Sequence, residues 1–140
     1  MGKIDVKRLI DILDRDGRRS FVDIAREFGV SEAAVRKKVK KLVEEGIIKR
    51  FTVEVDPRGI GYSVVACIGV DTEPEKLVSA ISLLKEDSRV RRLYASAGDH
   101  MLMLFSWFRR HGDMEEFVKE LESMEGVVKV CPAIILERIK

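Results

Sequence analysis

Basic residues at helical spacing between Ser31 and Glu45 are the part of this sequence best suited to chemistry. With about 100° between successive residues, the apolar residues of the segment fall on one stripe of a helix and the opposite side is basic. That side carries Ala33, Lys37, Lys40 and Glu44, with Arg36 and Lys41 beside them. A major groove of DNA admits one helix, whose lysines and arginines can meet phosphates or the O6 and N7 acceptors of guanine. The spacing therefore predicts a helix that binds duplex DNA.

Two further helices are predicted ahead of the basic one. Apolar residues at helical spacing predict the first helix over 4–16. Ser20, followed by Asp23, resembles a capping box and opens a short second helix that ends before Gly29. Ser31 then caps the basic helix. A tight connection with a glycine, between a short helix and a longer one, is typical of a helix-turn-helix.

A wing and flanking contacts complete the predicted DNA-binding domain. Alternating apolar residues predict a strand over 51–55, the natural wing. The sequence has no asparagine or glutamine, so the usual bidentate recognition of adenine is missing and DNA shape should supply part of the sequence preference. Base readout is expected from Ser31, Glu32, Arg36 or Lys37, and phosphate contacts from Arg18, Arg19, Lys49 and Arg50. The predicted DNA-binding residues are Arg18, Arg19, Ser20, Ser31, Glu32, Ala33, Arg36, Lys37, Lys40, Lys41 and Arg50.

The rest of the chain predicts a second domain of strands and helices. Strands are expected over 62–70, 90–96, 100–108 and 127–136, with a helix after the first strand and another after the third. This βαββαβ order is the ferredoxin-like motif. The turn residues of segment 56–61 are those expected of a hinge. The predicted fold class is therefore α+β, with a winged helix-turn-helix over 1–55, a hinge over 56–61 and a ferredoxin-like domain over 62–140.

The topology of the second domain also predicts an assembly. A ferredoxin-like sheet carries helices on one face only, so its other apolar face needs a cover. A second copy of the chain is the expected cover, which predicts a homodimer. Two-fold symmetry would suit paired DNA half-sites.

Composition and charge narrow the function classes. The chain has 140 residues, of which 46% are hydrophobic and 36% charged, enough for two small cores. No apolar run approaches the roughly 20 residues that cross a bilayer, so a cytoplasmic protein is expected.

The charge is unevenly distributed along the chain. Residues 1–61 hold 15 of the 26 Lys and Arg but 11 of the 24 Asp and Glu, a net +4, which leaves a net −2 for the remainder. The N-terminal part is therefore the candidate for a polyanionic partner. Abundant charge without asparagine or glutamine is expected of a hyperthermophilic source.

The cysteines and histidines do not form a reactive constellation in the sequence. Cys67 and Cys131 lie far apart in apolar runs and are predicted to be buried thiols. His100 and His111 lack partners at ligand or catalytic spacing. No catalytic residue, metal or cofactor is therefore predicted.

Four segments of the sequence match one known family. They are F-V-D-I-A-R-E-F-G-V-S-E-A-A-V-R-K-K-V-K-K-L-V-E-E-G-I-I, D-P-R-G-I-G-Y, S-A-G-D-H-M and V-C-P-A-I-I-L-E. In order and spacing they resemble the Lrp/AsnC family of leucine-responsive, feast/famine regulators, and its archaeal members in particular. The resemblance covers the whole chain. It implies a repressor or activator, often of its own gene, that forms dimers and often tetramers or octamers through a regulator-of-amino-acid-metabolism (RAM) domain.

The same resemblance implies a site for an amino-acid effector between dimers. In family members that sense amino acids, the site lies near a G-D-x-D turn and two polar positions of the last strand. The corresponding residues here are Gly98, Asp99, His100, Met101, Val130 and Pro132. Met101 replaces the second acid, Val130 and Pro132 replace hydroxyl-bearing residues, and each unmade buried hydrogen bond costs about 1–3 kcal/mol. An effector site and plain turn and strand packing both stay open for these residues.

Three other interpretations stay open at this point. The basic helix face could be a solvated surface without a partner. An architectural protein that packages or bends DNA without an effector would need the same basic face, and the preference for one site over random DNA separates it from a regulator. Some enzymes that decarboxylate sirohaem resemble the same two-domain architecture, and such an enzyme would bind a coloured tetrapyrrole.

Overall fold

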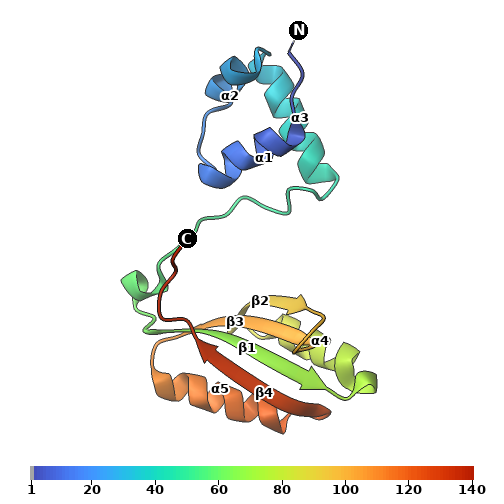
Figure 1. Ribbon diagram of the computed structural model, residues 1–140, viewed down its shortest axis with the longest axis vertical. Helices are drawn as coiled ribbons and strands as arrows, with labels where there is room; N and C mark the ends of the chain where they lie inside the picture. The colour runs from blue at the N-terminus through green and yellow to red at the C-terminus, as the bar shows by residue number, and fades with distance from the viewer. Residues whose placement is uncertain (1) are drawn as a thin grey trace. The chain divides into compact units, whose positions relative to one another are not determined.

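The computed structural model describes residues 2–140, which form two compact units (Figure 1). The first unit ends at Val55 and the second begins at Asp56. Each unit has a hydrophobic core of its own. Within residues 2–140 no helix has the length and apolar character needed to cross a membrane.

The first unit is a three-helix domain. Its helices are α1 (Val6–Arg15), α2 (Phe21–Phe28) and α3 (Glu32–Glu44). One residue of α1 and the inner faces of α2 and α3 make up its fully buried core, which consists of Leu9, Ile24, Ala25, Phe28, Val35, Val39 and Leu42. Because these residues recur at helical spacing, burying them leaves the opposite face of α3 in solvent.

The turn between α2 and α3 follows from its local sequence. Gly29 has a φ of 64°, in the left-handed region where glycine costs least, and it ends α2. Ser31 begins α3, because its hydroxyl accepts a 3.1 Å hydrogen bond from the backbone N–H of Ala34. Ser20 accepts the equivalent bond from Asp23 at the start of α2. The predicted helix-turn-helix is confirmed.

The predicted strand over 51–55 is wrong for the single chain. These residues lie in an extended segment without strand pairing, and Phe51 and Val53 are 54% and 77% exposed. A strand needs a neighbour for its backbone hydrogen bonds, and the described part of the first unit contains no other strand. Alternation of apolar residues is therefore not sufficient to form a strand in this segment.

The second unit opens with a turn and contains one antiparallel sheet. Pro57–Ile60 form a 3₁₀ turn that packs with this unit, where Arg58 donates to the carbonyl of Ile135. The elements that follow are β1 (Val64–Thr72), a 3₁₀ turn (Pro74–Lys76), α4 (Leu77–Glu86), β2 (Val90–Ala95), β3 (Leu102–Phe108), α5 (His111–Ser123) and β4 (Val127–Ile134). The strand order is β2-β3-β1-β4. This arrangement confirms the predicted βαββαβ order, with strand ends that differ from the predicted ones by at most two residues.

Both helices of the second unit cover the same face of the sheet (Figure 1). Alternate residues of β1, from Val64 to Val70, are buried with Leu84 of α4 and Phe117 of α5. The intervening residues point to the other side, which we call the open sheet face. It is formed by Val65, Cys67, Met103, Phe105, Trp107 and Tyr94.

The open sheet face explains one further difference from prediction. Cys67 and Cys131 are half-buried free thiols instead of fully buried ones. Both lie on the open sheet face, since Cys131 pairs with Gly69, two residues from Cys67. Among the described residues, α4 and α5 both pack on the other face. Partial burial raises the pKa of the Cys67 thiol.

Candidate nucleic-acid interface

The outward face of α3 forms a shallow basic hollow. It has a volume of about 390 Å³ and is lined by Glu32, Ala33, Arg36, Lys37 and Lys40. The small side chain of Ala33 leaves the space that the longer side chains surround. A hollow with an apolar methyl group and cations around it fits a base edge, because a thymine methyl packs on alanine and guanine acceptors bind arginine or lysine.

The cations of α3 are held to different degrees. Lys40 and Lys41 pair with Glu44 and Glu45 of the next turn at 3.9 and 3.7 Å. Within residues 2–140 no carboxylate lies within ion-pair distance of Lys37. Exposed pairs of this kind contribute about 0–1 kcal/mol, so a phosphate can replace the carboxylate at little cost.

Arg36 has two partners inside the domain. Its guanidinium pairs with Glu32 at 2.5 Å, and its central carbon lies 5.4 Å from the ring centroid of Phe21 on α2. Its side chain nevertheless remains 65% exposed. Phe21 is a contributor that sequence reasoning missed, because the contact joins two helices and no local pattern encodes it.

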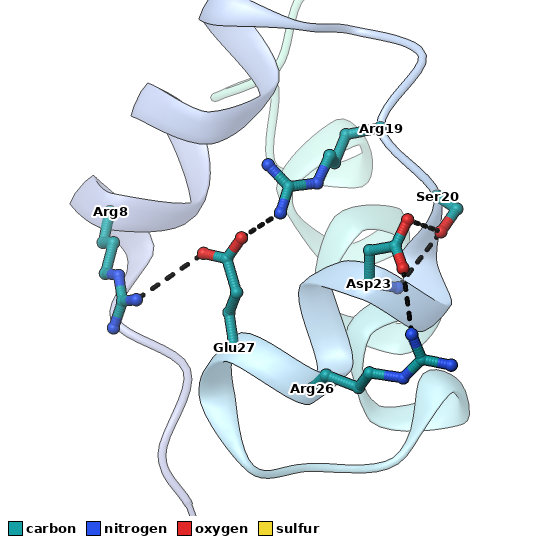
Figure 2. Close-up of polar contacts among 6 residues, drawn as sticks. All are labelled: Arg8, Arg19, Ser20, Asp23, Arg26 and Glu27. Atoms are coloured by element: carbon teal, nitrogen blue, oxygen red, sulfur yellow. Dashed lines mark hydrogen bonds and ion pairs between the residues drawn. The ribbon is translucent and has the colours of Figure 1, made fainter.

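Ser20 and Arg19 have structural partners (Figure 2). Ser20 caps α2 and donates from its hydroxyl to the Asp23 carboxylate at 2.7 Å. Glu27 of α2 pairs with Arg19 and, at 3.6 Å, with Arg8 of α1. This carboxylate joins α1, α2 and the segment between them, so Arg19 has a role in holding the domain together.

The other three predicted phosphate contacts lie together in a second place. Arg18 and Arg50, with Lys49, line a groove of about 960 Å³ between the end of α1 and the extended segment after α3. Leu13 and Phe51 give the same groove an apolar lining. Of the predicted DNA-binding residues, five line the hollow on α3 and two, Arg18 and Arg50, line this groove. Arg19, Ser20, Ser31 and Lys41 line neither.

The predicted effector turn is held by an acidic residue that the sequence analysis did not select. Asp71 of β1 accepts a 2.9 Å hydrogen bond from the backbone N–H of Met101 and pairs with Nδ1 of His100 at 2.9 Å. The hydrogen bond with His100 is the main cause of a lowered pKa at Asp71. The sequence did offer a signal for this role, because Asp71 is a charged residue near the end of an otherwise apolar strand.

The other predicted effector residues lie on the opposite side of the sheet. Val130 and Pro132 pair with Val70 and Ile68, whose side chains face α4 and α5. His100 covers Gly69 on the open sheet face, where a Cβ would clash with the imidazole ring. One chain therefore does not bring Val130 and Pro132 together with the turn at Gly98 and Asp99.

The three helices, the glycine turn and the basic outward face of α3 define a helix-turn-helix DNA-binding protein. Residues 6–49 match a family model described as winged helix-turn-helix DNA-binding. The chain is 48% identical to the HTH-type transcriptional regulator LrpA of Pyrococcus abyssi, over 96% of each chain. The protein belongs to the Lrp/AsnC family of transcriptional regulators.

Solved structures agree with this fold. Escherichia coli AsnC superposes with a TM-score of 0.79 at 21% identity, covering 99% of this chain and 95% of its own. A feast or famine regulatory protein from Mycobacterium tuberculosis, complexed with L-methionine, has a TM-score of 0.83 at 22% identity, covering 94% and 90%. These similarities confirm the α+β architecture.

Proposed function

We propose that the protein places α3 in the major groove and regulates transcription by sequence-specific binding, in the first place upstream of its own gene. The observation that carries this proposal is the exposed hollow on α3, where Arg36, Lys37 and Lys40 surround Ala33. Arg18 and Arg50 would contact the phosphates beside the groove. The site of action is the cytoplasm, where the DNA target lies. The chain has no proposed catalytic role.

The proposed DNA-binding form is a homodimer through the open sheet face. Phe105, Trp107 and Met103 are half-buried there, and among residues 2–140 both helices that pack on the sheet lie against its other face. Burying apolar surface stabilises association by roughly 25 cal/mol per Å² before the costs of ordering. A two-fold dimer presents two copies of α3, which suits a pseudo-palindromic site. Further assembly into tetramers or octamers is part of the same proposal.

An amino-acid effector at Gly98 to Met101 stays a prediction. The M. tuberculosis relative in complex with L-methionine is its support from outside this chain. Asp71 already satisfies the N–H of Met101, and Val130 and Pro132 offer no hydroxyl. We therefore expect L-methionine to raise the melting temperature of the protein little. A saturable rise that Asp99→Ala abolishes would support the effector site at this turn.

A binding titration tests the proposed function. The DNA upstream of the gene and random DNA are titrated with protein at two salt concentrations. A regulator should prefer its site by about 10³-fold or more at one salt concentration. Equal, steeply salt-dependent binding to both DNAs would instead support an architectural protein. No binding to either DNA, together with uptake of a coloured tetrapyrrole, would support the sirohaem-enzyme alternative.

A further inference from the structure

Arg36 differs from the other cations of α3 because it is held on two sides. Glu32 is the first residue of α3, and its carboxylate reaches the Arg36 guanidinium one turn later at 2.5 Å. On another side the guanidinium lies over the ring of Phe21, which is half-buried against the core of the domain. Lys40, in contrast, has one carboxylate partner at 3.9 Å.

The two restraints leave Arg36 able to bind a base. A guanidinium has five N–H donors, so one can stay with Glu32 while two others reach O6 and N7 of guanine. A phosphate contact is different, because a phosphate carries a negative charge whereas a base edge is neutral. The Glu32 carboxylate, 2.5 Å from the guanidinium, would therefore repel a phosphate placed beside Arg36 more than it would repel a base.

We propose that Glu32 is a positioning residue that directs Arg36 at base edges and discourages its contact with phosphates. Glu32 thereby increases the preference for the specific site over random DNA. This inference rests on the proposed DNA-binding function and adds a source of its specificity. The required contacts all lie within the N-terminal unit.

Glu32→Gln tests the role with Glu44→Gln as its matched control. Both substitutions remove one exposed carboxylate that pairs with a cation four residues away on α3. Glu32→Gln should raise affinity for random DNA about three-fold, the scale of one exposed charge interaction, without a matching gain at the specific site. The salt slope on random DNA should steepen by about one, because Arg36 gains a phosphate contact. Glu44→Gln frees Lys40, so it should strengthen binding to both DNAs equally.

A double-mutant cycle with Arg36→Ala shows whether Glu32 acts through Arg36. In the Arg36→Ala background, the Glu32→Gln change in preference should disappear. Circular dichroism of every variant checks that the helix content of the protein is unchanged. An unchanged or increased preference in Glu32→Gln, an equal loss of preference in Glu44→Gln, or a loss that persists without Arg36 would overturn the inference. Failure of the wild-type protein to bind DNA would instead refute the proposed function.

Discussion

The cations on α3 differ in how many partners hold each side chain, and their proposed roles in DNA binding differ accordingly. Lys40 is 77% exposed and has a weakly placed partner in Glu44, so it can follow a phosphate on any sequence. Arg36, held by Glu32 and Phe21, has a more defined direction. The side-chain types and the helix face were predictable from the sequence, since both follow from helical spacing. The contact with Phe21 was not, because it depends on the packing of α2 against α3.

Lys40→Ala should weaken binding to specific and random DNA alike. Loss of one phosphate contact should make the slope of log affinity against log salt shallower by about one. Lys119→Ala, an exposed lysine of α5 in the other unit, is the control and should leave DNA affinity unchanged. Titrations over a range of salt concentrations measure both variants. An unaltered slope in Lys40→Ala would mean that Lys40 does not contact phosphate.

Asp71 should make the second unit less stable in acid. Its hydrogen bonds with His100 and Met101 lower its pKa below the ordinary 3.8. A depressed carboxyl pKa stabilises the folded state above about pH 4, and this contribution is lost as pH falls through the folded pKa. Asp71→Asn should therefore show a smaller loss of unfolding free energy between pH 6 and pH 3. Urea unfolding followed by Trp107 fluorescence measures the unfolding free energy at each pH. Equal losses in the wild type and in Asp71→Asn would show that the Asp71 carboxylate does not cause the acid sensitivity.

The ends of α2 and α3 were the most predictable structural features of this chain. Ser20, Gly29 and Ser31 determine their turns by local chemistry, so the helix-turn-helix could be placed from the sequence. The segment 51–55 could not, because strand pairing depends on a partner outside that segment. The same limit applies to the turn at His100, whose carboxylate partner Asp71 comes from a distant strand.

Gly29→Ala should loosen the helix-turn-helix. A Cβ in the left-handed conformation costs about 1–2 kcal/mol, and Gly29 has a φ of 64°. Gly112→Ala in α5 is the control, because its added Cβ would meet nothing within 4 Å and alanine favours a helix. Hydrogen exchange should accelerate in α2 and α3 of the first variant alone. Unchanged protection in Gly29→Ala would show that the turn tolerates a side chain.

In the whole molecule, the two proposed roles belong to different units: DNA binding to the first and dimerisation to the second. The first unit carries the basic hollow and the second carries the open sheet face, each built on a separate core. The open sheet face was predictable from the βαββαβ order, which places both helices on one side of the sheet. The contacts of its aromatic side chains were not predictable. One example is Arg91, whose guanidinium carbon lies 3.7 Å from the centroid of the Trp107 ring.

Phe105→Asp should convert the proposed dimer into a monomer. A buried, unpaired carboxylate on the open sheet face would oppose association of two apolar surfaces. Leu83→Asp on α4 is the control, because Leu83 is 65% exposed on the helix side of the same unit. Sedimentation equilibrium distinguishes the two variants. A wild-type monomer, or dimers that survive Phe105→Asp, would refute the proposed interface.

The most direct test of the account is methylation protection of guanine N7 in the upstream DNA, because N7 lies in the major groove that α3 is proposed to enter. Bound protein should protect guanines in two major-groove segments about one helical turn, or a multiple of it, apart, as a two-fold dimer requires. Protection should weaken in Arg36→Ala at one position of each half-site. Bound protein that leaves every guanine N7 reactive would contradict the placement of α3.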